Sequence, residues 1–409
     1  MIYYVIGTLL SVFLIGLSNR FKLMKTVQSK RILFGVSLLP LLLLSSFRWN
    51  VGTDTWHTYT PEYLAMKSEK TELTEEEKAI MVECYQLDAV WDMGYTVEDA
   101  EKLGYEEAHK WFSKTYSHTA IGFQLLEKAL ISINADVQWL YIVTSLIILG
   151  FTYASIHMQS TKPLMAFLFF VITGNYFLSL NIVSQYIAIA ICIFSCYFIE
   201  KKKPLYFVLC VLLATCFHDS ALLFLPVYLL NYVKIKPNWC VVIVVVALLM
   251  GMYGFSYLES LIAVIAPQYV KYFSWQADFE WVFVALDVAV FVISGYYYEK
   301  GKDKPYYRLY FYLNVLGLIV LSFSGYIPLL KRVNYYYASM HFLFLPIIIE
   351  CETNINYKRI LTVLIICLYI LETIIAVGHL NKNGVLPYKV FYEGNRIKMT
   401  DEVRETFNY

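Results

Sequence analysis

Residues 47–54 read Phe-Arg-Trp-Asn-Val-Gly-Thr-Asp and hold the residue types best suited to chemistry in this chain. They follow an apolar run over residues 32–44, so a cation, Arg48, and a carboxylate, Asp54, lie just beyond a membrane exit. Because a charge costs several kcal/mol inside hydrocarbon, a pair held at its edge is expected to meet something polar. An ordinary interfacial anchor, with Trp49 in the aromatic belt, is the alternative interpretation.

Composition defines the class of protein. The 409 residues are 59% hydrophobic and 16% charged, with a mean hydropathy of +0.54, which is more apolar surface than a soluble core can hide. The chain is therefore predicted to be a polytopic membrane protein. A net charge of +1 gives no sign of a nucleic-acid partner, and the eight cysteines form neither a disulfide framework nor a zinc pattern. We find no motif for a cofactor or a metal ion.

The distribution of cations orients the chain. The first apolar stretch has no signal-peptide cleavage pattern and is expected to be a retained helix. Five cations follow it, namely Arg20, Lys22, Lys25, Lys30 and Arg31. The positive-inside rule makes this connection cytoplasmic and the N-terminus extracytoplasmic, so a second helix over about 32–46 delivers Arg48 and Asp54 to the outer face.

An acidic insert follows the motif. Residues 55–118 hold fourteen Asp or Glu against six Lys, which fits an external location. Capping boxes at Thr74–Glu77 and Thr96–Asp99 predict one helix to about residue 87 and another to about residue 112. Residues 121–133 are amphipathic and predict an interfacial helix. Together they predict a small helical cap at the outer face.

Two further polar clusters are expected on the outer side. Apolar runs over 164–177 and 182–199 are separated by a polar break at 178–181, which brings Asn181 and Gln185 to that face because Lys201 to Lys203 follow. The region 205–232 is interrupted at His218 and has basic residues on both sides, which favours a hairpin or re-entrant pair with His218 at its apex. A purely structural histidine is the alternative interpretation.

Apolar helices are predicted next over about 240–257, 281–297, 307–323, 335–349 and 359–377, for about twelve crossings in all. Four cations between 299 and 308 mark a cytoplasmic connection, which places Lys331 and Arg332 outside, against the usual charge bias. An anionic phosphate would compensate them, because Arg offers a planar fork for phosphoryl oxygens. The predicted division is residues 1–54 with the motif loop, 55–138 as the cap and interfacial helix, 139–378 as the transmembrane core, and 379–409 as an extracytoplasmic tail.

These ordered motifs resemble those of the EpsG-like group of Wzy-type polysaccharide polymerases. The resemblance rests on the segment from Arg48 to Asp54 with Tyr59, the Asn181 to Gln185 segment, residues 217–222, Lys331 and Arg332 leading into Tyr335 to Tyr337, and Pro387 with Tyr388. One departure is Ser184, which stands where that family usually has Arg. Either Lys331 and Arg332 supply the missing charge, or the donor-binding role of that helix is altered.

The resemblance implies an all-α, GT-C-like, metal-independent glycosyltransferase of the bacterial inner membrane, with both termini extracytoplasmic and no cofactor. It implies a donor and an acceptor that are undecaprenyl-diphosphate-linked oligosaccharides. It further implies a capsule, exopolysaccharide or O-antigen product, and flippase and chain-length regulator proteins as partners. Two other classes compete with it. A flippase for lipid-linked oligosaccharide should show an inverted repeat, which is not visible here, and a membrane-bound acyltransferase would normally take a cytoplasmic donor.

The expected roles follow from charge and titration range. Arg48 and Arg332 would neutralise the departing lipid diphosphate in the transition state. His218 is the expected base for the acceptor hydroxyl, with Asp54 as its rival. The expected substrate-binding residues are Lys331, Asn181, Gln185, Tyr59, Tyr336 and Tyr388.

Overall fold

A computed structural model describes residues 1–20, 35–49, 51–91, 93–115, 120–253, 260, 263–264, 281–325, 327, 329–386, 388 and 390. These residues are mostly helical, and their one extended pairing is an isolated antiparallel bridge between Arg48 and Val390. The all-α prediction is confirmed for this part of the chain. The predictions that concern residues 32–34, Asn50, residues 254–257, Pro387 and the tail from 391 onward lie outside the described residues.

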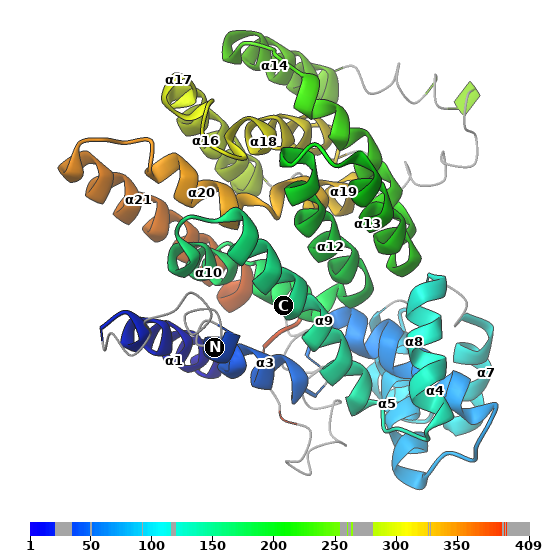
Figure 1. Ribbon diagram of the computed structural model, residues 1–409. Helices are drawn as coiled ribbons and strands as arrows, with labels where there is room; N and C mark the ends of the chain where they lie inside the picture. The colour runs from blue at the N-terminus through cyan, green and yellow to red at the C-terminus, as the bar shows by residue number, and fades with distance from the viewer. Residues whose placement is uncertain are drawn as a thin grey trace.

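The helices outside the insert begin with a hairpin of α1 (Ile2–Arg20) and α3 (Leu39–Ser46), which pack against each other (Figure 1). The remainder are α9 (Gln138–Gln159), α10 (Pro163–Ile172), α11 (Asn175–Asn181), α12 (Val183–Glu200), α13 (Pro204–Phe217), α14 (Pro237–Tyr253), α16 (Trp281–Tyr296), α17 (Tyr298–Gly301), α18 (Tyr307–Leu321), α19 (Leu329–Ala338), α20 (His341–Ile349) and α21 (Ile355–Thr373).

Several of these helices suit a membrane. Among the described residues, α9, α12 and the run Ile355–His379, in which a π-helical turn extends α21, are long and apolar enough to cross a bilayer. The pair α10 and α11 is long and apolar enough only when taken together, and its 54° bend fits a broken span or a re-entrant loop. Shorter apolar helices are Ile2–Leu14, α13, α14, Val284–Tyr296 and α18. The membrane class is thus supported, whereas twelve crossings and a GT-C-like architecture stay predictions.

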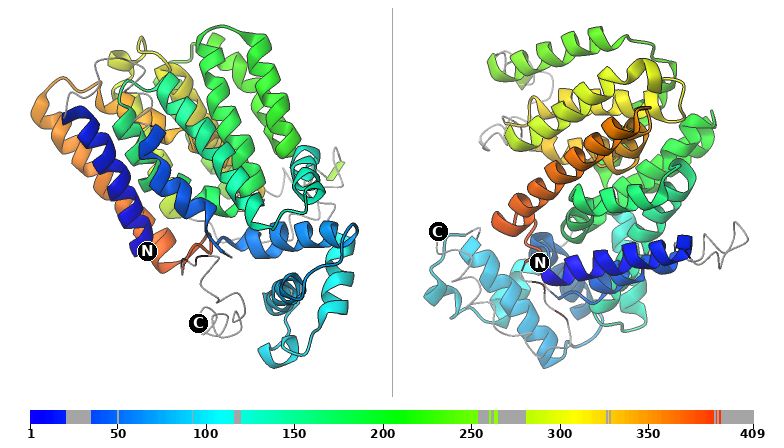
Figure 2. Two further views of the ribbon diagram at one scale, coloured as in Figure 1. Left: turned by 60° about the horizontal axis from the view of Figure 1, so that its bottom comes forward. Right: turned by 90° about the vertical axis from the view of Figure 1, so that its left-hand side faces the viewer.

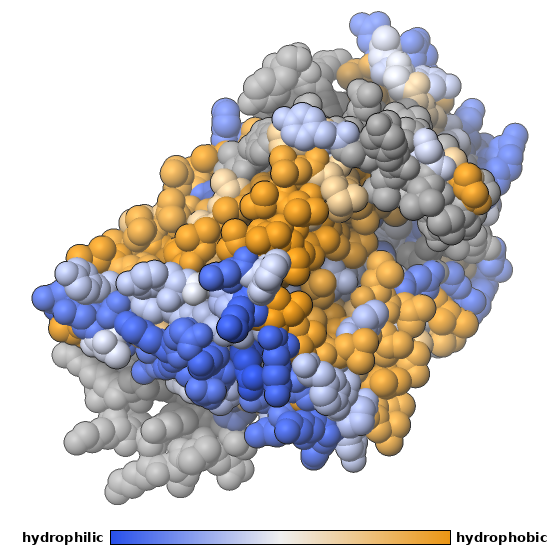
Figure 3. Space-filling model, turned by 90° about the horizontal axis from the view of Figure 1, so that it is seen from above, coloured by the Kyte–Doolittle hydropathy of each residue, from blue (hydrophilic) through white to orange (hydrophobic). Residues whose placement is uncertain are grey.

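Hydropathy on the surface agrees with this class. Figure 3 shows a broad hydrophobic area across the middle of one face, with hydrophilic residues gathered at opposite sides of it. Large apolar side chains are exposed along the outward face of α14, including Val241, Val245 and Leu249. In water such a surface would be costly, whereas lipid tails solvate it.

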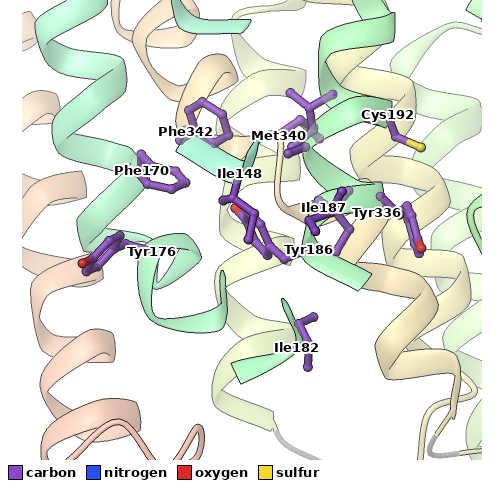
Figure 4. Packing of buried hydrophobic residues seen from close by; sticks show 14 of the residues in the cluster. Ile148, Phe170, Tyr176, Ile182, Tyr186, Ile187, Cys192, Tyr336, Met340 and Phe342 are labelled. Carbon is purple, nitrogen blue, oxygen red and sulfur yellow. The ribbon is translucent and has the colours of Figure 1, made fainter. Parts of the chain in front are cut away.

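Helix α12 lies at the centre of the bundle. It packs against α9, α11, α13 and α19, and fourteen of its eighteen residues are buried. Figure 4 shows Tyr186, Ile187 and Cys192 of this helix among aromatic and aliphatic side chains from its neighbours. Because protein surrounds most of α12, the polar side chains at its N-terminal end are held in fixed positions.

The insert forms its own helical layer beyond one end of the bundle (Figure 2). It consists of a π-helical turn (Thr55–Tyr59), α4 (Thr60–Ser68), α5 (Glu75–Trp91), α6 (Val97–Ala100), α7 (Tyr105–Thr115) and α8 (Ile121–Ser132). The first capping box is confirmed, because Thr74 Oγ1 accepts from Glu77 N at 3.2 Å and Glu77 Oε2 accepts from Thr74 N at 3.0 Å. A buried ion pair of 2.7 Å, Lys67 with Glu77, fixes α5 to α4.

The structure corrects three predicted boundaries. The single helix expected from the second capping box to residue 112 is two helices, because α6 ends at Ala100 and α7 begins at Tyr105. The segment 178–181 is the helical end of α11, and the chain breaks on both sides of this short helix: at Gly174, which has a φ of +76° and follows the end of α10, and at Ile182, which separates α11 from α12. The helix expected over 335–349 is α19 followed by α20.

The hairpin prediction over 205–232 is confirmed. Helix α13 ends at Phe217, His218 is extended, and a 3₁₀ helix (Asp219–Tyr232) returns along α13 and packs against it. His218 therefore occupies the apex, as its position between two short apolar arms predicts.

Candidate functional site

The motif loop is fixed by backbone hydrogen bonds to a later segment of the chain. Gly52 N donates to Gly384 O at 2.8 Å, and Thr53 N donates to Asn383 O at 3.2 Å. Gly52 has a φ of +102°, and a Cβ on it would lie 2.4 Å from Leu180 O. Only glycine satisfies both the left-handed backbone and this close approach to α11.

We expect Gly52→Ala to displace the motif loop. Strain at the left-handed backbone and the collision with Leu180 O should together cost about 1–3 kcal/mol of stability and remove activity. Thermal unfolding of the purified protein in detergent measures the first effect. Gly150→Ala, at a helical position with nothing within 4 Å of the added Cβ, is the matched control and should leave the rate unchanged and the stability unchanged or slightly higher. A Gly52→Ala protein with unchanged melting temperature and rate would contradict the packing described here.

Asn181 joins the motif to the end of α11. Its Oδ1 accepts from Thr53 Oγ1 at 3.0 Å and from Asp54 N at 2.9 Å. The side chain is buried, and a π-helical turn begins directly after Asp54. Single π-helical turns are frequent at functional sites because they redirect side chains that a regular helix would bury.

Asp54 faces a cation from a distant helix. Its Oδ2 lies 3.8 Å from Arg332 Nη2, and 19% of the Asp54 side chain and 54% of the Arg332 side chain are exposed. Burial raises the pKa of Asp54, whereas Arg332 and His57 act to lower it. His57 is itself held by Asp88, whose Oδ1 lies 2.5 Å from His57 Nδ1. A carboxylate and a guanidinium thus share a partly open site with an imidazole nearby.

Gln185 positions the helix that carries Arg332. Its Nε2 donates to Arg332 O at 2.8 Å, which fixes α19 to the N-terminal end of α12. On α19, Arg332 and Tyr336 are one turn apart and share a face. Gln185 and Tyr336 are both nearly inaccessible, so their position in the structure favours support of the site over direct contact with a large substrate.

His218 enters the same group through Ser220 and Tyr336. His218 Nδ1 lies 2.7 Å from Ser220 Oγ, and Ser220 Oγ donates to the Tyr336 hydroxyl oxygen at 3.1 Å. A serine has one hydroxyl hydrogen, so Ser220 must accept from an Nδ1–H on the imidazole. The neutral ring then has its lone pair on Nε2. Burial and nearby Arg332 lower the pKa of His218 to about 4, which makes the neutral form dominant near pH 7.

The contact of Tyr59 with Ser184 explains why a serine can stand at position 184, where an arginine was expected from the resemblance. Ser184 N donates to the Tyr59 hydroxyl oxygen at 3.1 Å, and Ser184 Oγ lies 3.2 Å from the same atom. Ser184 therefore anchors the turn after Asp54 onto α12. A charged side chain at this buried position would need a partner that the serine does not need.

Arg48 and Tyr388 lie in a different group. Arg48 is 1% exposed, donates from Nη1 to Ser45 O at 2.5 Å and to Ser145 Oγ at 3.3 Å, and lies over the Tyr141 ring. Tyr388 donates to Leu44 O at 3.0 Å and packs on aromatic rings of α1. Through these contacts, both residues help to hold the motif loop in position. Lys331 lines a separate cavity on another face of α19.

The structure thus brings together seven of the ten predicted residues: Asp54, Tyr59, Asn181, Gln185, His218, Arg332 and Tyr336. Sequence reasoning assigned no role to His57 or Ser220. His57 had a signal, because it lies one helical turn after Asp54, and Ser220 had one in its spacing from His218. No signal in the sequence could have indicated the backbone oxygens of residues 383 and 384, because every residue has a carbonyl group.

The fold and site define an integral membrane protein with a carboxylate, a guanidinium and a neutral histidine gathered at one end of a helical bundle. The EpsG family model matches residues 31–390. The chain belongs to the EpsG family, a family of Wzy-like polysaccharide polymerases whose reaction is of the glycosyltransferase type. Neither a curated protein nor a solved structure gives a significant match to it.

Proposed function

We propose that the protein polymerises undecaprenyl-diphosphate-linked oligosaccharide repeat units into a cell-surface polysaccharide at the outer face of the bacterial cell membrane. The observation that carries this proposal is the convergence of Asp54, His218 and Arg332, which come from segments far apart in sequence. A base, a carboxylate and a phosphate-binding cation are the groups that glycosyl transfer from a lipid diphosphate needs.

In this reaction a hydroxyl oxygen of the acceptor unit attacks the anomeric carbon of the donor glycan. The new glycosidic C–O bond forms as the bond from that carbon to the diphosphate oxygen breaks. The hydroxyl proton goes to Nε2 of His218, and undecaprenyl diphosphate leaves with the bonding electron pair. Arg332 neutralises the charge that grows on the diphosphate, so the chemistry uses side chains and is metal-independent.

Asp54 orients the Arg332 guanidinium and is the second candidate for the base. We assign Asn181, Gln185, Tyr59 and Tyr336 to the positioning of these groups, because their contacts are with the protein. For Arg48 and Tyr388 the assignment changes from substrate contact to support of the motif loop, because their contacts are with α1, α3 and α9.

The same proposal includes about twelve crossings in a GT-C-like bundle, with residues 55–138 as an extracytoplasmic cap and both termini outside. The charge distribution supports this orientation, since the basic turns at Lys201 to Lys203 and Lys300 to Lys304 lie opposite the motif loop in the order of crossings. Exposed Ile121 and Leu125 on α8 support contact of that helix with the bilayer surface.

Chain elongation tests the function. Purified protein is incubated in detergent with the undecaprenyl-diphosphate repeat units of its host, with a chelator in place of metal, and the products are separated on a gel. A ladder of increasing glycan length is the expected result. Unchanged substrate, with protein that is folded by its melting curve, would contradict the proposal, and movement of the units across vesicle membranes would then favour a transporter.

The elongation rate should fall when the pH is lowered. His218 has a pKa of about 4, so its neutral form is available above that value and is lost as pH falls. The pKa of Asp54 is raised, so its anion is also lost on the acid side. We expect a steady rate from about pH 8 to pH 6 and a decline below about pH 5. Recovery on return to pH 7 is the control, and a rate that increases on acidification would contradict these assignments.

A further inference from the structure

A cavity of about 250 Å³ lies on the other face of α19. It is walled by residues of α11, α16, α18, α19, α20 and α21 together with the segment after α21. Its ionisable lining residues are Asp287, Lys331, His341, Glu372 and Lys382. The reaction proposed above uses none of the carboxylates or the histidine in this set. Ionisable groups inside a membrane bundle are costly and usually mark a functional site.

A network of hydrogen bonds fixes part of this lining. Asn334 Nδ2 donates to Asp287 Oδ2 at 3.3 Å, and His341 Nδ1 lies 3.6 Å from Asp287 Oδ1. Asn314 completes the network, since its Oδ1 lies 2.8 Å from His341 Nε2 and its Nδ2 donates to Asp287 O at 3.3 Å. These polar side chains are held in one arrangement before any ligand arrives, which lowers the entropy cost of binding.

Three residues of the lining have a polar atom that lacks a hydrogen-bond partner. Among the described residues, the Tyr369 hydroxyl, Glu372 Oε2 and Asn334 Oδ1 are buried and form no hydrogen bond. Tyr369 is 6% exposed, and its hydroxyl lies near the carboxyl groups of Asp287 and Glu372. A buried polar group without a partner destabilises the folded protein, so these groups indicate a polar occupant of the cavity.

The charges select the kind of occupant. Two carboxyl groups, Asp287 and Glu372, balance two amines, Lys331 and Lys382. The carboxyl groups would repel a phosphate, and the amines would repel a metal cation. An uncharged molecule with many hydroxyl groups suits the cavity better, because each hydroxyl can donate to a carboxylate and accept from an amine or amide. The rings of Tyr335 and Tyr369 add apolar surface of the kind that packs on a sugar face.

The cavity is a direct neighbour of the reaction site. Two adjacent residues of α19 belong to different sites. Arg332 faces Asp54 in the reaction site, and Lys331 lines the cavity. Asn383 also lines the cavity, and its carbonyl accepts the Thr53 N–H next to Asp54. A molecule bound in the cavity is therefore held close to the groups that act on the donor.

We infer that this cavity binds an uncharged sugar ring of the repeat-unit glycan and so forms a saccharide subsite beside the reaction site. The inference rests on the proposed function for the identity of the glycan. It concerns binding of the saccharide alone, without its lipid diphosphate, so it can be tested apart from elongation.

The test measures binding of lipid-free repeat-unit oligosaccharide, released from the host polymer, to the full-length protein in detergent by saturation-transfer NMR titration. The double variant Tyr369→Phe with Glu372→Gln changes the unpartnered groups of Tyr369 and Glu372 with little change in shape. We expect it to bind at least about ten-fold more weakly than wild type, as loss of one or two hydrogen bonds predicts. The exposed Tyr357→Phe is the matched control and should bind normally.

Arg332→Ala separates the two sites, because it should impair elongation and leave saccharide binding intact. Undiminished binding by the double variant, an equal loss in Arg332→Ala, or absence of binding to wild type would each overturn the inference. Melting curves that match wild type show that a loss of binding is local. If the saccharide binds as expected while no ladder forms, the proposed function fails and the subsite stands.

Discussion

Replacing His218 with alanine is expected to lower the elongation rate by about 10²–10⁴-fold, the usual contribution of a positioned general base. The loss should appear in kcat, with little change in KM for the donor, because the imidazole acts on the acceptor proton. Rates with purified lipid-linked units over a range of donor concentrations measure both constants. Exposed His379→Ala is the matched control and should be fully active.

Ser220→Ala refines this prediction. Without the Ser220 oxygen, Nδ1 of His218 loses its hydrogen-bond partner and the imidazole can adopt the other tautomer, which places a hydrogen on Nε2. We expect a smaller loss than for His218→Ala and a changed acid limb of the pH profile. A correctly folded His218→Ala protein that works at the wild-type rate would remove His218 from the mechanism and leave Asp54 as the base.

Arg332→Ala is expected to lower kcat/KM for the lipid-linked donor by about 10²–10³-fold, the cost of losing one preorganised charge at a developing oxyanion. Arg332→Lys should restore part of the loss, because it keeps the charge but not the planar fork. The exposed Arg308→Ala is the matched control, since Arg308 lies in the first turn of α18, next to the basic turn that follows α17.

Combining Arg332→Ala with Asp54→Asn tests whether the pair acts as a unit. At an Oδ2 to Nη2 distance of 3.8 Å, the two losses should not add, and the coupling should be about 0.5–3 kcal/mol. Full additivity, or a wild-type rate for Arg332→Ala at limiting donor, would show that the diphosphate is bound elsewhere.

Much of the site could be predicted from the sequence, because its charged and titratable residues interrupt apolar surroundings. Arg332 is a cation where the predicted orientation allows few, and His218 interrupts an apolar hairpin, so both residues stand out in the hydropathy pattern. The structure places Arg332 beside Asp54 and within electrostatic reach of His218. The capping box at Thr74 was equally local, since the helix start is decided by residues three apart.

Other features depend on contacts that a single sequence does not contain. Arg48 carries the same interfacial signal as Arg332, yet Ser145 and Tyr141 of α9 bury it. Which of two interfacial arginines stays open is decided by the packing of distant helices. The division of α19 from α20 near Ser339 follows from tertiary packing as well, because that segment has neither Gly nor Pro at the break.

One signal was present and unused. Asp287 and Glu372 stand inside apolar runs, where a carboxyl group is rare unless it meets a polar partner. Taken together, they would have indicated a polar cavity within the predicted transmembrane core. Their common cavity with Lys331 emerges only when α16, α19 and α21 are placed side by side.

The most direct measurement of the central claim is the stoichiometry of the reaction. Purified protein is supplied with labelled lipid-linked repeat units, and released undecaprenyl diphosphate is counted against new glycosidic bonds. We predict one lipid diphosphate released for each unit added, with both quantities falling together in His218→Ala and Arg332→Ala. Release of lipid diphosphate without new bonds, or new bonds formed at the wild-type rate by both variants, would contradict glycosyl transfer at this site.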